Sequence, residues 1–158
     1  MLLYYRGDGS MKRYIKATNI FGMSKSKSDL AAWIEDRTFP TMCALAQLYV
    51  FPNNENKNHW RQEVWGSFNR IHVFRHNNKL PSAEFIYKSS WGVDSGFVES
   101  AIDWAIDKEA KFTPRDDINI QELTDIMNSY FIWISEMLSK DIFISTNKVY
   151  KELDELGL

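Results

Sequence analysis

The stretch Ile120-Gln-Glu-Leu-Thr-Asp-Ile-Met-Asn-Ser-Tyr-Phe-Ile-Trp-Ile-Ser-Glu-Met-Leu-Ser139 shows the clearest helical periodicity in the chain. Its apolar residues recur every three or four positions, the spacing that places them on one face of an α-helix. Asn119 directly precedes the stretch and is a residue type that caps helix N-termini. We therefore predict a helix over 120–139 and expect it to lie at the centre of the fold.

Further segments on both sides of this stretch show helical patterns bounded by capping residues and helix breakers. Pro40 separates the first two, because the residue before a proline avoids the helical region of the backbone. Residues 42–51 are apolar on most sides, which is typical of a buried helix. These segments are 30–37, 42–51, 57–74, 82–90, 95–111 and 147–156. The sequence predicts an all-α, single-domain bundle of six or seven helices.

The N-terminal part of the chain has a different character. Leu2 to Tyr5 and Arg13 to Phe21 are rich in aromatic and β-branched residues, and Gly7-Asp8-Gly9 lies between them. This pattern is typical of a small β-hairpin that docks on the helices. We therefore divide the chain into an N-terminal extension or hairpin over residues 1–26 and a helical domain over residues 27–158.

Length and composition exclude several classes of protein. The 158 residues, 44% of them hydrophobic, suffice for the core of one domain. The single cysteine, Cys43, rules out an internal disulfide and lies in an apolar run typical of a buried position. No apolar run approaches the roughly 20 residues that a membrane-spanning helix requires. The N-terminus is too polar for a signal peptide, so we expect a cytoplasmic protein without a membrane span.

The charges are unevenly distributed along the chain. Residues 1–93 hold 13 basic and 7 acidic residues, whereas residues 94–158 hold 6 basic and 14 acidic residues. An asymmetry of this kind favours a protein or nucleic-acid partner for one half of the chain. The alternative is that the two halves pack together and neutralise each other within the fold. A steering field arises only where charges of one sign share a surface.

The segment 57–76 combines basic and aromatic residues and is the candidate for contact with nucleic acid. Its stripe of Trp60, Val64, Phe68 and Ile71 predicts a face buried in the core, and Gly66 within it predicts close packing of a neighbour. Arginines beside an exposed tryptophan can grip phosphates and stack on bases. The predicted partner-binding or nucleic-acid-binding residues are Arg61, Trp65, Arg70, His72 and His76.

Acidic residues of the second half form the second candidate surface. Asp103 and Asp107 share one face of a predicted helix, and Asp116 and Asp117 are adjacent in a predicted loop. Such an acidic surface fits a basic protein partner and could imitate the phosphates of nucleic acid. Paired carboxylates can also hold Mg²⁺ or serve as acid and base, so a metal-dependent hydrolase using the acidic half is an alternative.

No pattern in the chain identifies a metal or cofactor site. His72 and His76 have the spacing of two ligands on one helix face, but no third ligand accompanies them. Walker A, Gly-x-Gly-x-x-Gly and Gly-x-Ser-x-Gly motifs are missing from the sequence. We therefore predict a small non-enzymatic interaction protein without a cofactor, a regulator or inhibitor of a macromolecular partner such as phages or mobile elements encode.

Overall fold

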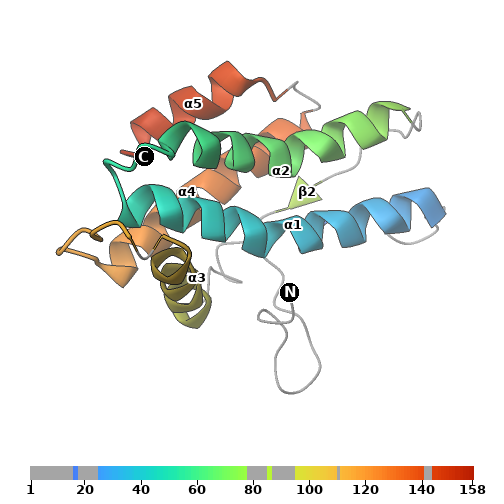
Figure 1. Cartoon of the computed structure of the whole chain (residues 1–158). Coiled ribbons are helices and arrows are strands. Elements are labelled where there is room, and N and C mark those ends of the chain that lie inside the picture. The colour runs from blue at the N-terminus through green and yellow to red at the C-terminus, as the bar shows by residue number, and fades with distance from the viewer. Residues whose placement is uncertain (1–15, 18–24, 78–84, 87–94, 110, 141–143) are drawn as a thin grey trace.

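The computed structural model describes residues 16–17, 25–77, 85–86, 95–109, 111–140 and 144–158, and side chains over 38–67, 69, 95–109, 111–137, 140 and 144–158. Figure 1 shows α1 and α2 side by side, with α3 packed on α1 and α5 on α2. The elements are β1 (Lys16–Ala17), α1 (Lys25–Val50), α2 (Lys57–Asn77), β2 (Phe85–Ile86), α3 (Ser95–Lys108), α4 (Ile120–Ser139) and α5 (Thr146–Glu155). The helical class is confirmed for this part of the chain. The count of six or seven helices is not confirmed, since the described residues form five.

The first helix, α1, continues through a proline. The prediction of two separate helices over 30–37 and 42–51 is therefore wrong. Inside a helix, a proline removes one hydrogen bond and costs about 3 kcal/mol or more. Pro40 is exposed, whereas its neighbours Phe39 and Thr41 are buried. The proline ring thus lies on the solvent side, and packing of the inner side chains holds the helix together across it.

The second half of α1 is buried among three other helices. Every residue from Thr41 to Phe51 is buried, and α1 packs against α2, α3 and α4. This corrects the expectation that the helix over 120–139 lies at the centre. α4 is amphipathic and leaves Ile132 43% exposed, so it can bury only one face. The segment 41–51 is apolar nearly all round and is stable only with neighbours on every side.

The prediction for α4 itself is confirmed. The helix spans Ile120–Ser139, and the Asn119 Oδ1 accepts the Glu122 backbone N–H at 3.0 Å, as a capping side chain does. Its fully buried apolar residues follow the predicted period: Leu123, Met127, Tyr130, Phe131 and Ile134. Local periodicity and the cap therefore suffice to place this helix.

The two short strands join distant parts of the chain. β1 pairs antiparallel with β2, so that Lys16 lies opposite Ile86. The predicted helix over 82–90 is wrong at Phe85–Ile86, because these residues are extended to pair with β1, and the rest of that range lies outside the described residues. The predicted N-terminal hairpin is not confirmed, since Leu2 to Tyr5 also lies outside them. The domain division at residue 26 stays a prediction.

The last helix, α5, is bounded by local signals at both ends. The Ser145 side chain caps its start by accepting the Lys148 N–H at 3.2 Å. At the other end, Gly157 has a φ of +79°, and the Leu158 N–H reaches the Leu153 carbonyl at 2.8 Å. This is the hydrogen bond of a Schellman motif, which a glycine in the left-handed conformation permits. The predicted helix over 147–156 is confirmed within one residue at each end.

The predicted helix over 57–74 corresponds to α2, in which Trp60 and Val64 are buried as expected. The side chains of Phe68 and Ile71 lie outside the described ones. A Cβ placed on Gly66 would have no described atom within 4 Å. The expectation that this glycine marks a closely packed neighbour is therefore wrong.

Because the space beside Gly66 is open, we expect Gly66→Ala to raise the free energy of unfolding by about 0.5–1 kcal/mol through higher helix propensity. Urea denaturation followed by circular dichroism measures the change. Gly157→Ala is the opposite control, because a side chain is strained at a φ of +79° and stability should fall. A loss of stability in both variants would contradict the open space at position 66.

Candidate functional site

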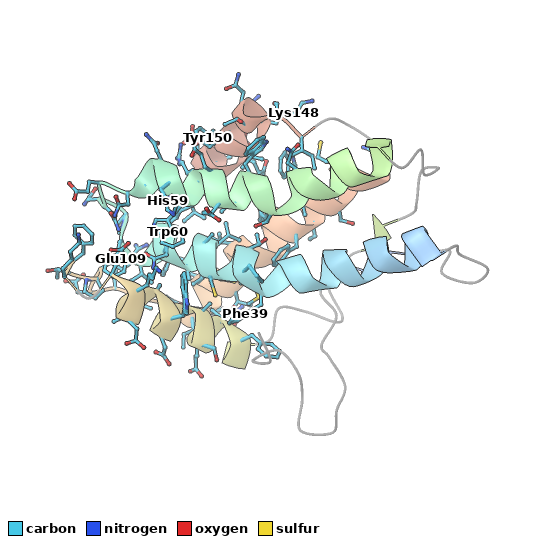
Figure 2. All side chains as sticks on the ribbon, turned by 45° about the vertical axis from the view of Figure 1, so that its right-hand side comes forward. Phe39, His59, Trp60, Glu109, Lys148 and Tyr150 are labelled. Carbon is cyan, nitrogen blue, oxygen red and sulfur yellow. The ribbon has the colours of Figure 1, made fainter. Side chains whose placement is uncertain are left out.

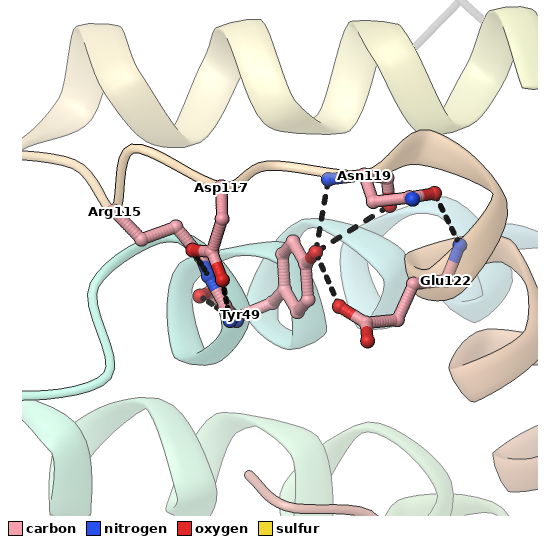
Figure 3. Close-up of polar contacts among 5 residues, drawn as sticks. All are labelled: Tyr49, Arg115, Asp117, Asn119 and Glu122. Carbon is pink, nitrogen blue, oxygen red and sulfur yellow. Dashed lines mark hydrogen bonds and ion pairs between the residues drawn. The ribbon is translucent and has the colours of Figure 1, made fainter.

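A tyrosine at the end of α1 connects the core to the surface (Figure 3). The Tyr49 hydroxyl donates to Glu122 Oε1 at 2.7 Å and accepts the Asn119 backbone N–H at 3.0 Å. A hydroxyl has one hydrogen, so the longer contact of 3.5 Å to the Asn119 carbonyl is the weaker alternative. Burial, followed by the hydrogen bond to Glu122, raises the pKa of Tyr49. The phenol therefore stays protonated and holds one oxygen of the Glu122 carboxylate in place.

The loop before α4 is fixed to the same tyrosine by Arg115. The Arg115 guanidinium carbon lies 4.2 Å from the centroid of the Tyr49 ring, close enough for a cation–π interaction. The Arg115 Nε and Nη2 donate to the two carboxylate oxygens of Asp117 at 2.7 and 3.2 Å. The Arg115 backbone N–H also donates to the Val50 carbonyl at 2.9 Å. These contacts fasten the loop across the end of α1.

A groove opens on the outer side of this network. Its volume is about 480 Å³, and it is open to solvent. α4 and the residue before it supply most of the lining, and Leu156 from the end of α5 supplies the rest. The lining residues are Asn119, Gln121, Glu122, Asp125, Ile126, Ser129 and Leu156. The groove thus combines two carboxylates with two aliphatic side chains and has no basic residue in its lining.

Neutral donors orient both carboxylates of the groove. Tyr49 holds Glu122 Oε1, and the Gln121 amide donates to Asp125 Oδ1 at 2.9 Å. Each hydrogen bond fixes a side chain without cancelling its charge. Among the described residues, no cation pairs with either carboxylate. Within the described part of the chain, the second oxygen of each carboxylate accepts no hydrogen bond, so it can accept a donor from outside.

The four predicted acidic residues are divided between two elements. Asp103 and Asp107 are exposed on α3, one turn apart, with no cationic partner among the described residues. Asp116 is likewise exposed and unpaired within the described part of the chain. Asp117 is exposed, but Arg115 pairs with it and lowers its pKa. Asp117 is thus engaged in an ion pair within the loop. Partner binding by Asp103, Asp107 and Asp116 stays a prediction.

Two of the predicted basic-aromatic residues contact the last helix. Arg61 Nη2 forms an ion pair with Asp154 Oδ1, and the guanidinium carbon lies 5.4 Å from the centroid of the Tyr150 ring. The Trp65 Nε1 donates to the Ile144 carbonyl at 2.9 Å. Both side chains are therefore engaged within the molecule. The side chains of Arg70, His72 and His76 lie outside the described ones.

The described residues contain no group of three or more His, Cys, Asp and Glu side chains that could hold a metal ion. Likewise, no helix in the described ranges is both long and apolar enough to cross a membrane. Cys43 is buried as predicted, and burial raises the pKa of its thiol to about 12. Such a thiol stays protonated near neutral pH and is a poor nucleophile.

Comparisons of the chain with protein-family models, with curated proteins and with solved structures find no match.

The residues that line this groove are not among those predicted from the sequence to bind a partner, and neither are Tyr49 and Arg115 beside it. Tyr49 lies in an apolar run, and the pattern predicts an ordinary core residue there. For Leu156 the pattern predicts the inner face of a short helix. Arg115 belongs to no recognised sequence motif. Tyr49 offers the one local signal, because its position in an apolar helix predicts burial of its hydroxyl. A buried hydroxyl needs a hydrogen-bond partner, which must come from another element.

The ion pair between Arg115 and Asp117 should make stability depend on pH. A lowered pKa keeps Asp117 charged in the folded state, so its contribution is present above the ordinary value of 3.8 and is lost as pH falls through the lower folded value. We expect Asp117→Asn to be less stable than wild type at neutral pH. The difference should shrink below pH 3.8, which thermal melts over a pH series would measure.

Asp116→Asn is the matched control for this prediction. It removes the same charge from the adjacent position, where the described residues offer no cationic partner. We expect it to change stability little at any pH in the series. Equal effects of the two substitutions would contradict a specific role of the Arg115–Asp117 pair.

Proposed function

We propose that this chain is a non-enzymatic interaction protein whose groove binds a basic segment of a protein partner. The observation that carries the proposal is the pair of oriented, unneutralised carboxylates, Glu122 and Asp125, set beside aliphatic side chains. A regulator or inhibitor acts by such binding and needs no catalytic group. The hydrolase alternative lacks a comparable observation, since the described carboxylates form no metal-binding group.

The chemistry of the groove fits a lysine or arginine side chain. Such a side chain carries an aliphatic stem and a charged head, and it lowers its free energy by covering apolar surface with the stem. Ile126 and Leu156 offer that surface, and the free carboxylate oxygens offer acceptors to the head. Because Tyr49 and Gln121 already orient the carboxylates, binding a cation costs less conformational entropy than at two freely rotating side chains.

The surrounding charge supports a basic partner. Residues 95–125 hold eight acidic and three basic residues, a net charge of −5. The exposed carboxylates Asp103, Asp107 and Asp116 belong to this segment. A field of one sign accelerates the approach of an oppositely charged partner and orients it. Where that partner handles nucleic acid, the acidic surface would compete with phosphates for the same basic residues.

Binding of a short fluorescein-labelled lysine–leucine peptide, measured by fluorescence anisotropy at low salt, tests the proposal. We expect the double substitution Glu122→Gln with Asp125→Asn to weaken the affinity about tenfold, which corresponds to about 1.4 kcal/mol for the loss of two partly exposed charge pairs. Added salt should weaken binding to wild type more than to this variant.

The matched control is Asp103→Asn with Asp107→Asn, which changes the net charge equally on α3, outside the groove lining. We expect that variant to keep most of the affinity. An equal loss in both double variants would show attraction by net charge alone, and no binding to wild type would remove the groove as a basic-peptide site.

Tyr49→Phe tests the positioning role of the phenol. The ring remains under Arg115, but Glu122 loses its donor and the Asn119 N–H loses its acceptor. We expect a loss of about 1–2 kcal/mol of stability from the unpaired N–H, together with a few-fold weaker peptide affinity. Thermal melts and the anisotropy assay measure the two effects. Unchanged affinity in this variant would show that the phenol supports the fold without orienting the carboxylate.

A further inference from the structure

The basic-aromatic side of α2 is covered by α5. Figure 2 shows Tyr150 on α5, on the other side of α2 from the buried Trp60. Arg61 is 12% exposed because Asp154 pairs with its guanidinium and Tyr150 packs against it. The Trp65 indole donates to the backbone just before α5. Two of the side chains that the sequence predicts for a partner, Arg61 and Trp65, are therefore engaged by a segment of the same chain.

The covering helix has the properties of a bound helical ligand. Its caps, Ser145 and Gly157, belong to its own segment, so both ends of the helix are closed without groups from the rest of the fold. It buries an apolar row of Val149 and Leu153, and Leu158 just after its end is buried as well. Beside this row lies the carboxylate of Asp154, which meets Arg61. An amphipathic helix in an apolar groove, with charged residues at its edge, is a recurrent mode of recognition between proteins.

Docking of α5 leaves polar groups without partners in its surroundings. Within the described structure, the Arg61 Nε and the Tyr130 hydroxyl are buried and accept or donate no hydrogen bond. Glu152 on α5 is partly buried, and this burial, with repulsion from Glu155, raises its pKa. Buried polar groups without partners lower the free energy gained on docking. The surface of α2 that α5 covers, the seat of α5, is therefore not fully satisfied by α5, and a ligand that supplied an acceptor to the Arg61 Nε would bind it better.

We propose that the seat of α5 on α2 binds an amphipathic helix of a partner protein, one that carries carboxylates beside its apolar row. α5 occupies the same surface and competes with the partner helix from within the chain. The apolar row of α5 and the Asp154–Arg61 pair define what this occupant must supply. Single-stranded nucleic acid would pair with Arg61 but would not cover the surface against which Val149 and Leu153 are buried. This seat is distinct from the acidic groove, and the inference does not rest on the function proposed for that groove.

A labelled peptide of residues 144–158, added to the full-length chain, tests this inference by fluorescence anisotropy. Leu153→Ala in the chain removes a buried anchor of α5, and Asp154→Lys places a positive charge beside Arg61. Both changes should loosen the chain's own α5. We expect each variant to bind the wild-type peptide at least tenfold more tightly than the wild-type chain does. A peptide that itself carries Asp154→Lys should bind poorly to all chains.

Circular dichroism would verify that the variants keep the rest of the fold. Asp154 is 66% exposed, so Asp154→Lys still tests the inference should Leu153→Ala unfold the chain. Equal peptide affinities of wild type and Asp154→Lys would overturn the proposal. It would also be overturned if a single-stranded oligonucleotide bound the Asp154→Lys chain more tightly than the peptide does, because the seat would then prefer nucleic acid to a helix.

Discussion

Burial of the second half of α1 on all sides is the constraint on which the rest of the structure depends. This segment includes polar groups as well as apolar ones, and each polar group requires a partner from another element. The Gln47 amide donates to the Ala105 carbonyl at 3.1 Å and so ties α1 to α3. Tyr49 does the same for the start of α4. The buried helix thus holds α3 and the start of α4 against itself.

The candidate groove follows from this constraint. Tyr49 is 2% exposed, yet its hydroxyl reaches a carboxylate at the surface. A core residue therefore orients a surface charge, and the rigidity of the core is transmitted to Glu122. Arg115 contributes from the other side by stacking on the same ring and pairing with Asp117. The geometry of the acidic groove therefore depends on the packing around α1.

α2 shows how one helix serves two purposes. Its inner side supplies Trp60, whose ring lies 5.6 Å from that of Trp104 on α3, and thereby joins the core. Its other side presents Arg61 and Trp65, which α5 covers. The sequence pattern correctly predicts that Trp60 and Val64 are buried, whereas Trp65, which it predicts to be exposed, is partly buried against the core. It does not reveal that α5 covers this side, because Asp154, which pairs with Arg61, is 93 positions away in the chain.

The sequence by itself determined the helical class, the bounds of α4, the position of α5 within one residue, and the burial of Trp60 and Val64, because caps and apolar periodicity act over a few residues. Only the tertiary structure decided that α1 continues through Pro40, that Phe85–Ile86 is extended, and that Tyr49 holds Glu122. These features depend on contacts between distant segments, whose free energies exceed local preferences. For the same reason, free carboxylates could be told from paired ones only once Arg115 and Asp117 were placed together.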